Sequence, residues 1–176
     1  MTSTRSHVAQ PGLRVAIERQ YGAAIDMLEN AIAACPDEVW GDRIAWHEFW
    51  YLVYHTLFWL DFYMTEARDD FAPPPPFTLA EMDPAGVFPE RIYTKDELQT
   101  YLEHAQAKAR RRFGGLTEED LRQPRRFARI DGTLAEELLY NLRHVQHHTG
   151  QLNLILRQRT DDAPRWVGAT SLTDEE

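Results

Sequence analysis

Apolar side chains recur at steps of three and four residues along most of the chain, which is the period of an amphipathic helix. The pattern is clear in residues 12–34, where one helical face carries Val15, Tyr21, Ile25, Leu28 and Ile32. Pro36 follows, and proline interrupts a helix because it has no amide hydrogen to donate. The sequence therefore predicts a first helix over residues 12–34.

A second helix is predicted over residues 44–66, where almost every side of the helix is apolar or aromatic. A helix that is apolar on all sides is buried on all sides. The following residues, 67–93, contain the run Pro73–Pro76 and two further prolines. They predict a long irregular connection of twenty-seven residues.

Two further helices are marked by the spacing T-x-x-E, at residues 94–97 and 133–136. In this capping box, the threonine and glutamate side chains each bind a free backbone amide of the first helical turn. The third helix is expected to stop at Gly115, and the fourth to continue to about Arg159. No alternating strand pattern competes with the helical one.

Four long helices predict an all-α four-helix bundle in a single domain over residues 1–160. The connection between the second and third helices is long enough to run the length of a bundle, which favours an up-down-down-up order. Residues 161–176 are polar and end acidic, and we expect them to form a loose C-terminal tail.

Charge and cysteine content restrict the function and the compartment. The 176 residues include 28 acidic and 19 basic side chains, giving a net charge of −9, which argues against binding nucleic-acid phosphates. The longest apolar stretch, 49–64, is shorter than a membrane span requires. The single cysteine, Cys35, and an N-terminus without an apolar signal core favour a cytoplasmic protein.

The fourth helix carries the strongest chemical signal, a pair of histidines four residues apart. His144 and His148 project from one helical face, and two imidazoles so placed can share a metal ion. Asn141 and Gln151 fall near His148 on this face, whereas His147 lies to one side, so we expect all three in the pocket or around the ligands. An isolated pair of this kind more often simply hydrogen-bonds to a neighbouring helix.

A third histidine changes that balance. His55 lies in the aromatic stripe of the second helix, with Trp59 on its own face, and needs a polar partner there. With His144 and His148 facing it, the three side chains form a metal site that leaves coordination positions open, as in catalytic or substrate-binding sites. We therefore predict His55, His144 and His148 as ligands of one divalent ion.

Other metal-site patterns are absent from the sequence. Glu48 follows His47, but the second histidine of a zinc-protease H-E-x-x-H motif is missing. No glutamate precedes any histidine by three residues, which excludes the di-iron carboxylate pattern. Glu48 remains a candidate general base, and a solvated position at a bundle end is the alternative.

The other side of the second helix is apolar as well. Trp46, Trp50 and Leu57 lie on this side, and the surplus of apolar surface predicts a homodimer interface anchored by the tryptophans. The alternative is that the long proline-containing connection folds over the same side.

Two segments together resemble the DinB-like superfamily. They are YHTLFWLDFY in the second helix and LRHVQHHTGQL in the fourth, with its spacing H-x-x-HH-x-GQL. The resemblance covers residues 12–159. It implies an up-down-down-up bundle, often a homodimer, with a three-histidine site for nickel, zinc, manganese or another divalent ion. Carried over by motif position, the ligands are His55, His144 and His148.

The resemblance also suggests an activity, since some similar proteins are transferases or isomerases that use low-molecular-weight thiols such as bacillithiol or mycothiol. The leading hypothesis is a metal-dependent enzyme that makes a small-molecule thiol nucleophilic at neutral pH. A metal-dependent hydrolase is the alternative enzyme. A non-enzymatic metal-binding stress or interaction dimer is the alternative outside catalysis.

Overall fold

The protein is mostly helical, as expected, in a computed structural model that describes residues 11–44, 47–128 and 130–173. The helices are α1 (Leu13–Ala34), α2 (Asp37–Trp40), α3 (Phe49–Tyr63), α4 (Lys95–Gly115) and α5 (Leu134–Thr160). Helix α3 is shorter than predicted, because the residues before it form the two strands of a small hairpin. The strands are β1 (Arg43–Ile44) and β2 (His47–Glu48).

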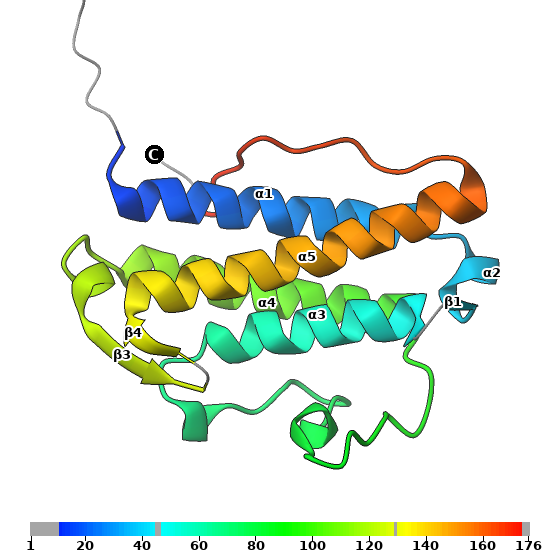
Figure 1. Ribbon diagram of the computed structural model, residues 1–176, viewed down its shortest axis with the longest axis horizontal. Coiled ribbons are helices and arrows are strands. Elements are labelled where there is room, and N and C mark those ends of the chain that lie inside the picture. The colour runs from blue at the N-terminus through cyan, green and yellow to red at the C-terminus, as the bar shows by residue number, and fades with distance from the viewer. Residues whose placement is uncertain (1–10, 45–46, 129, 174–176) are drawn as a thin grey trace, which may run out of the picture.

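The four long helices lie side by side (Figure 1). Helix α5 packs against α1 and α3, and α4 packs against the other side of the same two helices. In the view of Figure 1, α1 and α5 run in one direction along the molecule, and α3 and α4 run in the other. The site described below lies between α3 and α5.

Both predicted capping boxes are present. The hydroxyl of Thr94 accepts from the amide of Glu97, and the Glu97 carboxylate accepts from the amide of Thr94 at 2.9 Å. Thr133 and Glu136 make the same pair of bonds at the start of α5. Each box satisfies amides that have no partner within the first turn of the helix.

A second hairpin precedes α5 and was not expected from the sequence. Strand β3 (Pro124–Phe127) pairs antiparallel with β4 (Ile130–Thr133). The dipeptide Asp131–Gly132, which would be typical of a turn, lies within β4. Both hairpins are short ribbons at bundle ends, and their few residues carry too little alternation to compete with the helical period.

Helix α3 is enclosed by the protein, because the connection between α3 and α4 packs along its outer side. This crossover contains two short 3₁₀ helices, η1 (Arg68–Asp70) and η2 (Leu79–Met82). Phe77 stacks on Tyr101 of α4 at a centroid distance of 4.4 Å and packs beside Tyr54 of α3. Helix α3 is strongly apolar. Even so, no helix among the described residues is long and apolar enough to cross a membrane.

The side chains predicted at a subunit interface lie inside the single chain. Trp50 is 5% exposed and Leu57 is 0% exposed. Tyr93, at the end of the crossover, meets the Trp50 ring edge-on at 5.9 Å. Trp50 and Leu57 are therefore covered within the chain and offer no exposed surface to a second subunit. Trp46 lies outside the described residues.

The C-terminal segment is not loose, contrary to expectation. Residues 161–173 run back along α1 (Figure 1). The buried carboxylate of Glu18 accepts from the amides of Leu172 and Thr173. Gly22 permits the close approach, because a Cβ atom there would lie 2.0 Å from the carbonyl oxygen of Thr170. This strap, residues 161–173, covers one face of α1.

A buried ion pair joins α3 to α4. Asp61 is 0% exposed and accepts from the Lys108 ammonium at 2.5 Å and from the Tyr101 hydroxyl at 3.2 Å. His104 of α4 is half-buried, with Nε2 3.6 Å from the same carboxylate. Burying a carboxylate is costly unless it is paired in this way.

We predict that Asp61→Asn lowers the free energy of unfolding by about 3 kcal/mol, because it leaves the Lys108 ammonium without its buried counter-charge. Urea denaturation followed by circular dichroism measures the change. Glu119→Gln is the matched control, since Glu119 pairs with Arg122 at 3.1 Å on the surface. That control is expected to cost less than about 0.5 kcal/mol. Equal effects of the two substitutions would show that the buried pair does not stabilise the fold.

Candidate metal centre

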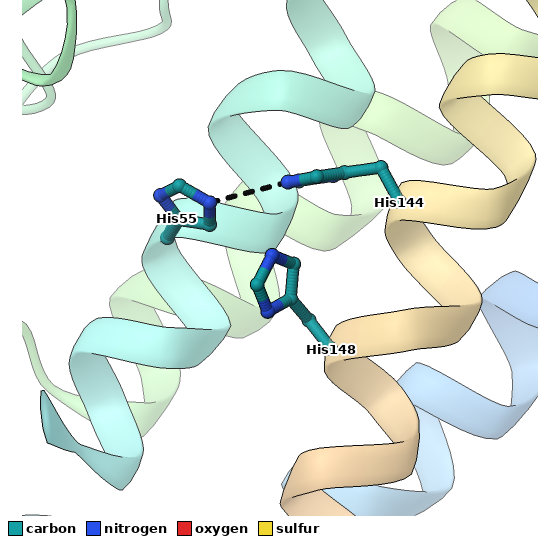
Figure 2. A group of neighbouring side chains, drawn as sticks. All are labelled: His55, His144 and His148. Carbon is teal, nitrogen blue, oxygen red and sulfur yellow. Dashed lines mark hydrogen bonds between the residues drawn. The ribbon is translucent and has the colours of Figure 1, made fainter. Parts of the chain in front are cut away.

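The three predicted ligands meet between α3 and α5. His55 comes from the middle of α3, and His144 and His148 come from successive turns of α5. One ring nitrogen from each lies within 4.8 Å of the others, and Figure 2 shows the three rings turned toward a shared space. Nε2 of His55 lies 3.1 Å from Nε2 of His144.

This spacing fits a shared metal ion. A histidine nitrogen binds zinc at about 2.0–2.1 Å, so two nitrogens that share an ion are separated by at most about 4.2 Å. The 3.1 Å between His55 and His144 satisfies that limit, and His148 stands beside both, with ring centroids 4.7 Å and 4.5 Å away. The donor set is three imidazoles, which suit several first-row divalent ions.

The outward-facing nitrogens of two ligands have hydrogen-bond partners. Nδ1 of His55 lies 2.5 Å from Oε1 of Glu81, and Nδ1 of His148 lies 2.7 Å from Oε1 of Gln151. A carboxylate accepts only, so the hydrogen is on Nδ1 of His55 and its Nε2 carries a lone pair. With the Gln151 amide oxygen as acceptor, the same holds for His148. Partners of this kind fix the tautomer that binds a metal.

His144 is partly buried. Burial is the main reason that its pKa is lowered to about 3, and the neighbouring histidines, His148 before His55, add to the effect. The ring is therefore neutral at physiological pH, which is the form that binds a metal. Its buried Nδ1 has no hydrogen-bond partner among the described residues.

Glu81 is a part of the site that the sequence did not reveal. It belongs to η2 in the crossover, and its side chain is only 6% exposed. Its second oxygen, Oε2, accepts from the Tyr51 hydroxyl at 3.0 Å. The pKa of Tyr51 is raised, mainly by burial and further by the Glu81 charge. No periodicity links Glu81 to His55, because the two are joined by irregular chain.

Glu48, the acid singled out from the sequence, is not part of this cluster. It is the N-cap of α3, seven residues before His55, or about 10 Å along the helix axis. No described contact joins its side chain to the three histidines. The carboxylate that reaches His55 is that of Glu81.

The residues predicted around the ligands divide into two groups. Gln151 and Trp59 contact ligands, the first by its bond to His148 and the second by an edge-on ring contact with His55 at 6.3 Å. The exposed ring of His147 packs edge-on against His148 at 4.9 Å. Asn141 faces elsewhere in the core, where its amide donates to the carbonyl of Leu60 at 3.3 Å.

A cavity of about 220 Å³ opens beside the histidines. Its lining consists of His55, Trp59, Tyr63, Tyr140 and His144. A second depression shares Tyr140 and His144 with it and adds Arg143 and His147. No carboxylate of the described residues pairs with Arg143, so a guanidinium is available near the centre.

The only cysteine of the chain, Cys35, is a buried packing residue at the C-cap of α1. Burial raises the pKa of the Cys35 thiol to about 12. Lys95 partly opposes that effect. The protein therefore has no reactive thiol of its own among its described side chains, and any thiol chemistry at the histidines needs a thiol from outside.

Comparison with known proteins identifies a family that this chain matches. The family model of the DinB superfamily matches residues 20–152, a range that contains all three histidines and Glu81. No curated protein and no solved structure matches the chain.

We predict that Cys35 of the native protein reacts very slowly with dithionitrobenzoate at pH 8. With a pKa of about 12, the thiolate fraction at pH 8 is about one in ten thousand, and thiolate is the reactive form. Protein unfolded in guanidinium should release one equivalent of chromophore at the rate of a free cysteine. Rapid labelling of the native protein would contradict the burial of this thiol.

Proposed function

The chain belongs to the DinB superfamily, and we propose that it is a divalent-metal-dependent enzyme that transfers a small thiol to an electrophile. One observation carries the proposal: His55, His144 and His148 direct ring nitrogens at a common point beside a cavity. Three histidine ligands leave coordination positions open for a substrate, whereas closed structural sites use four protein ligands. Nickel, zinc and manganese all suit this donor set.

We extend the proposal to the fold, as the up-down-down-up four-helix bundle that the family resemblance implies. The opposite directions of the pairs α1/α5 and α3/α4 in Figure 1 support it. So does the long crossover, which leads from the end of α3 back to the start of α4 at the other end of the molecule. This order places α3 beside α5, as the site requires.

In the proposed reaction, the bound ion supplies a Lewis acid that lowers the pKa of a small thiol. Glu81 and Gln151 hold two of the histidines in the tautomer that binds metal. Cys35 is buried and takes no part, so the thiol is a cosubstrate. The proton that the thiol loses passes to solvent at the open side of the cavity.

The cavity indicates which electrophiles would fit. Trp59, Tyr63 and Tyr140 give it a largely aromatic wall, which favours a small apolar or flat group. Arg143 lies in the adjoining depression, where its guanidinium would favour an anionic group on either substrate. A volume of about 220 Å³ limits the buried part of the substrate to a small group.

The transfer step conserves atoms and electrons without a redox partner. The sulfur lone pair of the thiol attacks the electrophilic carbon and forms a C–S bond. The bond to the leaving group breaks, and the leaving group departs with the electron pair. With chlorodinitrobenzene, the products are the aryl thioether, chloride and one proton.

We predict about one divalent ion per chain when the protein is purified without a histidine tag. His148→Ala should lose the ion, whereas His147→Ala should keep it, because the exposed His147 ring lies beside the cluster and not among its converging nitrogens. Elemental analysis measures the content. A hundredfold excess of ion over its Kd should stabilise the wild-type protein by about 2.7 kcal/mol.

One result would contradict the predicted metal content. If the wild-type protein contains no ion and gains no thermal stability from nickel, zinc or manganese, the three histidines are only a hydrogen-bonded cluster. The metal-dependent function then fails with them.

We also predict metal-dependent turnover when small thiols are offered with chlorodinitrobenzene or monobromobimane. Trp59→Ala should lower kcat/KM for the aromatic electrophile about tenfold and leave the metal content unchanged, because Trp59 lines the cavity without reaching the ion. Trp59→Phe, which keeps an aromatic wall, is the matched control and should lose less.

The alternatives give different results in the same assays. Hydrolysis of activated esters without any thiol requirement would replace the transferase by a metal-dependent hydrolase. Strong stabilisation by the ion without turnover of any substrate would favour a non-enzymatic metal-binding protein.

A further inference from the structure

We infer that Glu81 is the positioning residue of the metal centre and that, through it, metal binding is coupled to docking of the crossover on α3. The inference rests on the proposed metal-binding function and goes beyond it. It assigns a role to a residue of the irregular connection, and it makes that connection part of the site.

Glu81 contacts two residues of α3, and these contacts hold its carboxylate in one position. Its Oε1 lies 2.5 Å from Nδ1 of His55, and its Oε2 accepts from the Tyr51 hydroxyl at 3.0 Å. Tyr51 and His55 are four residues apart, so their side chains lie on one face of α3 and hold both carboxylate oxygens. The carboxylate cannot turn away from His55 without losing both bonds.

Burial makes the charge of Glu81 important. At 6% exposure the carboxylate has little contact with water, and a buried charge needs compensation. Three neutral histidines give a divalent ion no negative charge. Glu81, which is hydrogen-bonded to His55, supplies the negative charge nearest to the centre. A carboxylate bonded to Nδ1 also makes Nε2 a stronger metal ligand.

The crossover is docked by the same residues. Tyr51 holds Glu81 through its hydroxyl, and its ring packs against Phe88 further along the crossover at a centroid distance of 4.7 Å. On the other side of Glu81 along the chain, the backbone carbonyl of Thr78 accepts from the Tyr54 hydroxyl at 3.3 Å. If docking strengthens metal binding, linkage requires that metal binding strengthens docking by the same factor.

The first test is a Co²⁺ titration of the full chain, followed by the visible absorption of the bound ion. Glu81→Gln should weaken binding 10- to 100-fold, the usual loss when an outer partner of a ligating histidine is removed. Glu90→Gln is the matched control, because it makes the same charge change at an exposed position of the same crossover. It should bind Co²⁺ within about twofold of the wild-type protein.

Tyr51→Phe keeps the carboxylate and the ring contact with Phe88 but removes one bond to Glu81. We expect it to weaken Co²⁺ binding about fivefold, from the loss of one hydrogen bond. If circular dichroism shows that Glu81→Gln does not fold, Tyr51→Phe tests the role of Glu81 in its place. A purely structural role of Glu81 would lower the stability of the ion-free protein without changing the affinity of folded molecules for Co²⁺.

The second test measures crossover docking by limited proteolysis with chymotrypsin. Phe77 is buried between Tyr54 and Tyr101, so cleavage of the Phe77–Thr78 bond requires the crossover to leave α3. Saturating Co²⁺ should slow this cleavage several-fold in the wild-type protein and in Glu90→Gln. The same ion should give no protection in Glu81→Gln, where the connection between the centre and the crossover is broken.

Two results overturn the inference while leaving the metal centre intact. One is a folded Glu81→Gln protein that binds Co²⁺ as tightly as the wild type. If Glu81→Gln does not fold, the same result in a folded Tyr51→Phe protein takes its place. The other is cleavage after Phe77 at a rate that Co²⁺ does not change. If the wild-type protein itself binds no Co²⁺, the proposed function fails and the inference fails with it.

Discussion

The enclosure of α3 determines how the rest of the chain is arranged. Helices α4 and α5 cover two sides of α3. Its remaining side carries aromatic rings, and exposing them to water would be unfavourable. The crossover must therefore lie along the helix instead of looping into solvent, and Phe77 and Tyr93 pack against it. The same docking carries Glu81 to His55, so the need to cover an apolar helix places a charged group at the candidate metal centre.

Two clusters of polar side chains lie inside this apolar surrounding. On one side of α3, Asp61 is paired with Lys108 of α4, and on another, His55 is bonded to Glu81 and faces His144. The two clusters differ in a way that matters for function. The first is closed and balanced in charge, whereas the second leaves lone pairs turned toward a common point beside a cavity.

Most of the helical fold could be predicted from the sequence, because helical period and capping chemistry are local properties. The boxes at Thr94 and Thr133 fixed the starts of α4 and α5, and Gly115 fixed one end. The two hairpins were missed because they are a few residues long. The ordered strap was missed because its anchor, the Glu18 carboxylate, binds backbone amides that leave no trace in the side-chain pattern.

The metal centre could be predicted only in part, for a related reason. His144 and His148 share a face at a spacing that any helix imposes, and His55 stood out as a polar group in an aromatic stripe. Glu81 depends on where an irregular chain lies in space, which no residue spacing encodes. The subunit interface expected at Trp50 assumed an open helix face, and the crossover covers that face.

The strap has a consequence for how the C-terminal sequence can vary. Glu18 binds the main chain at Leu172 and Thr173, so it recognises the distance along the chain from the end of α5 and not the identity of the intervening side chains. Substitutions between residues 162 and 169 leave this anchor in register. A one-residue insertion or deletion there shifts which amides reach Glu18 and moves Leu172 out of its buried place, so length is the constrained property of this segment.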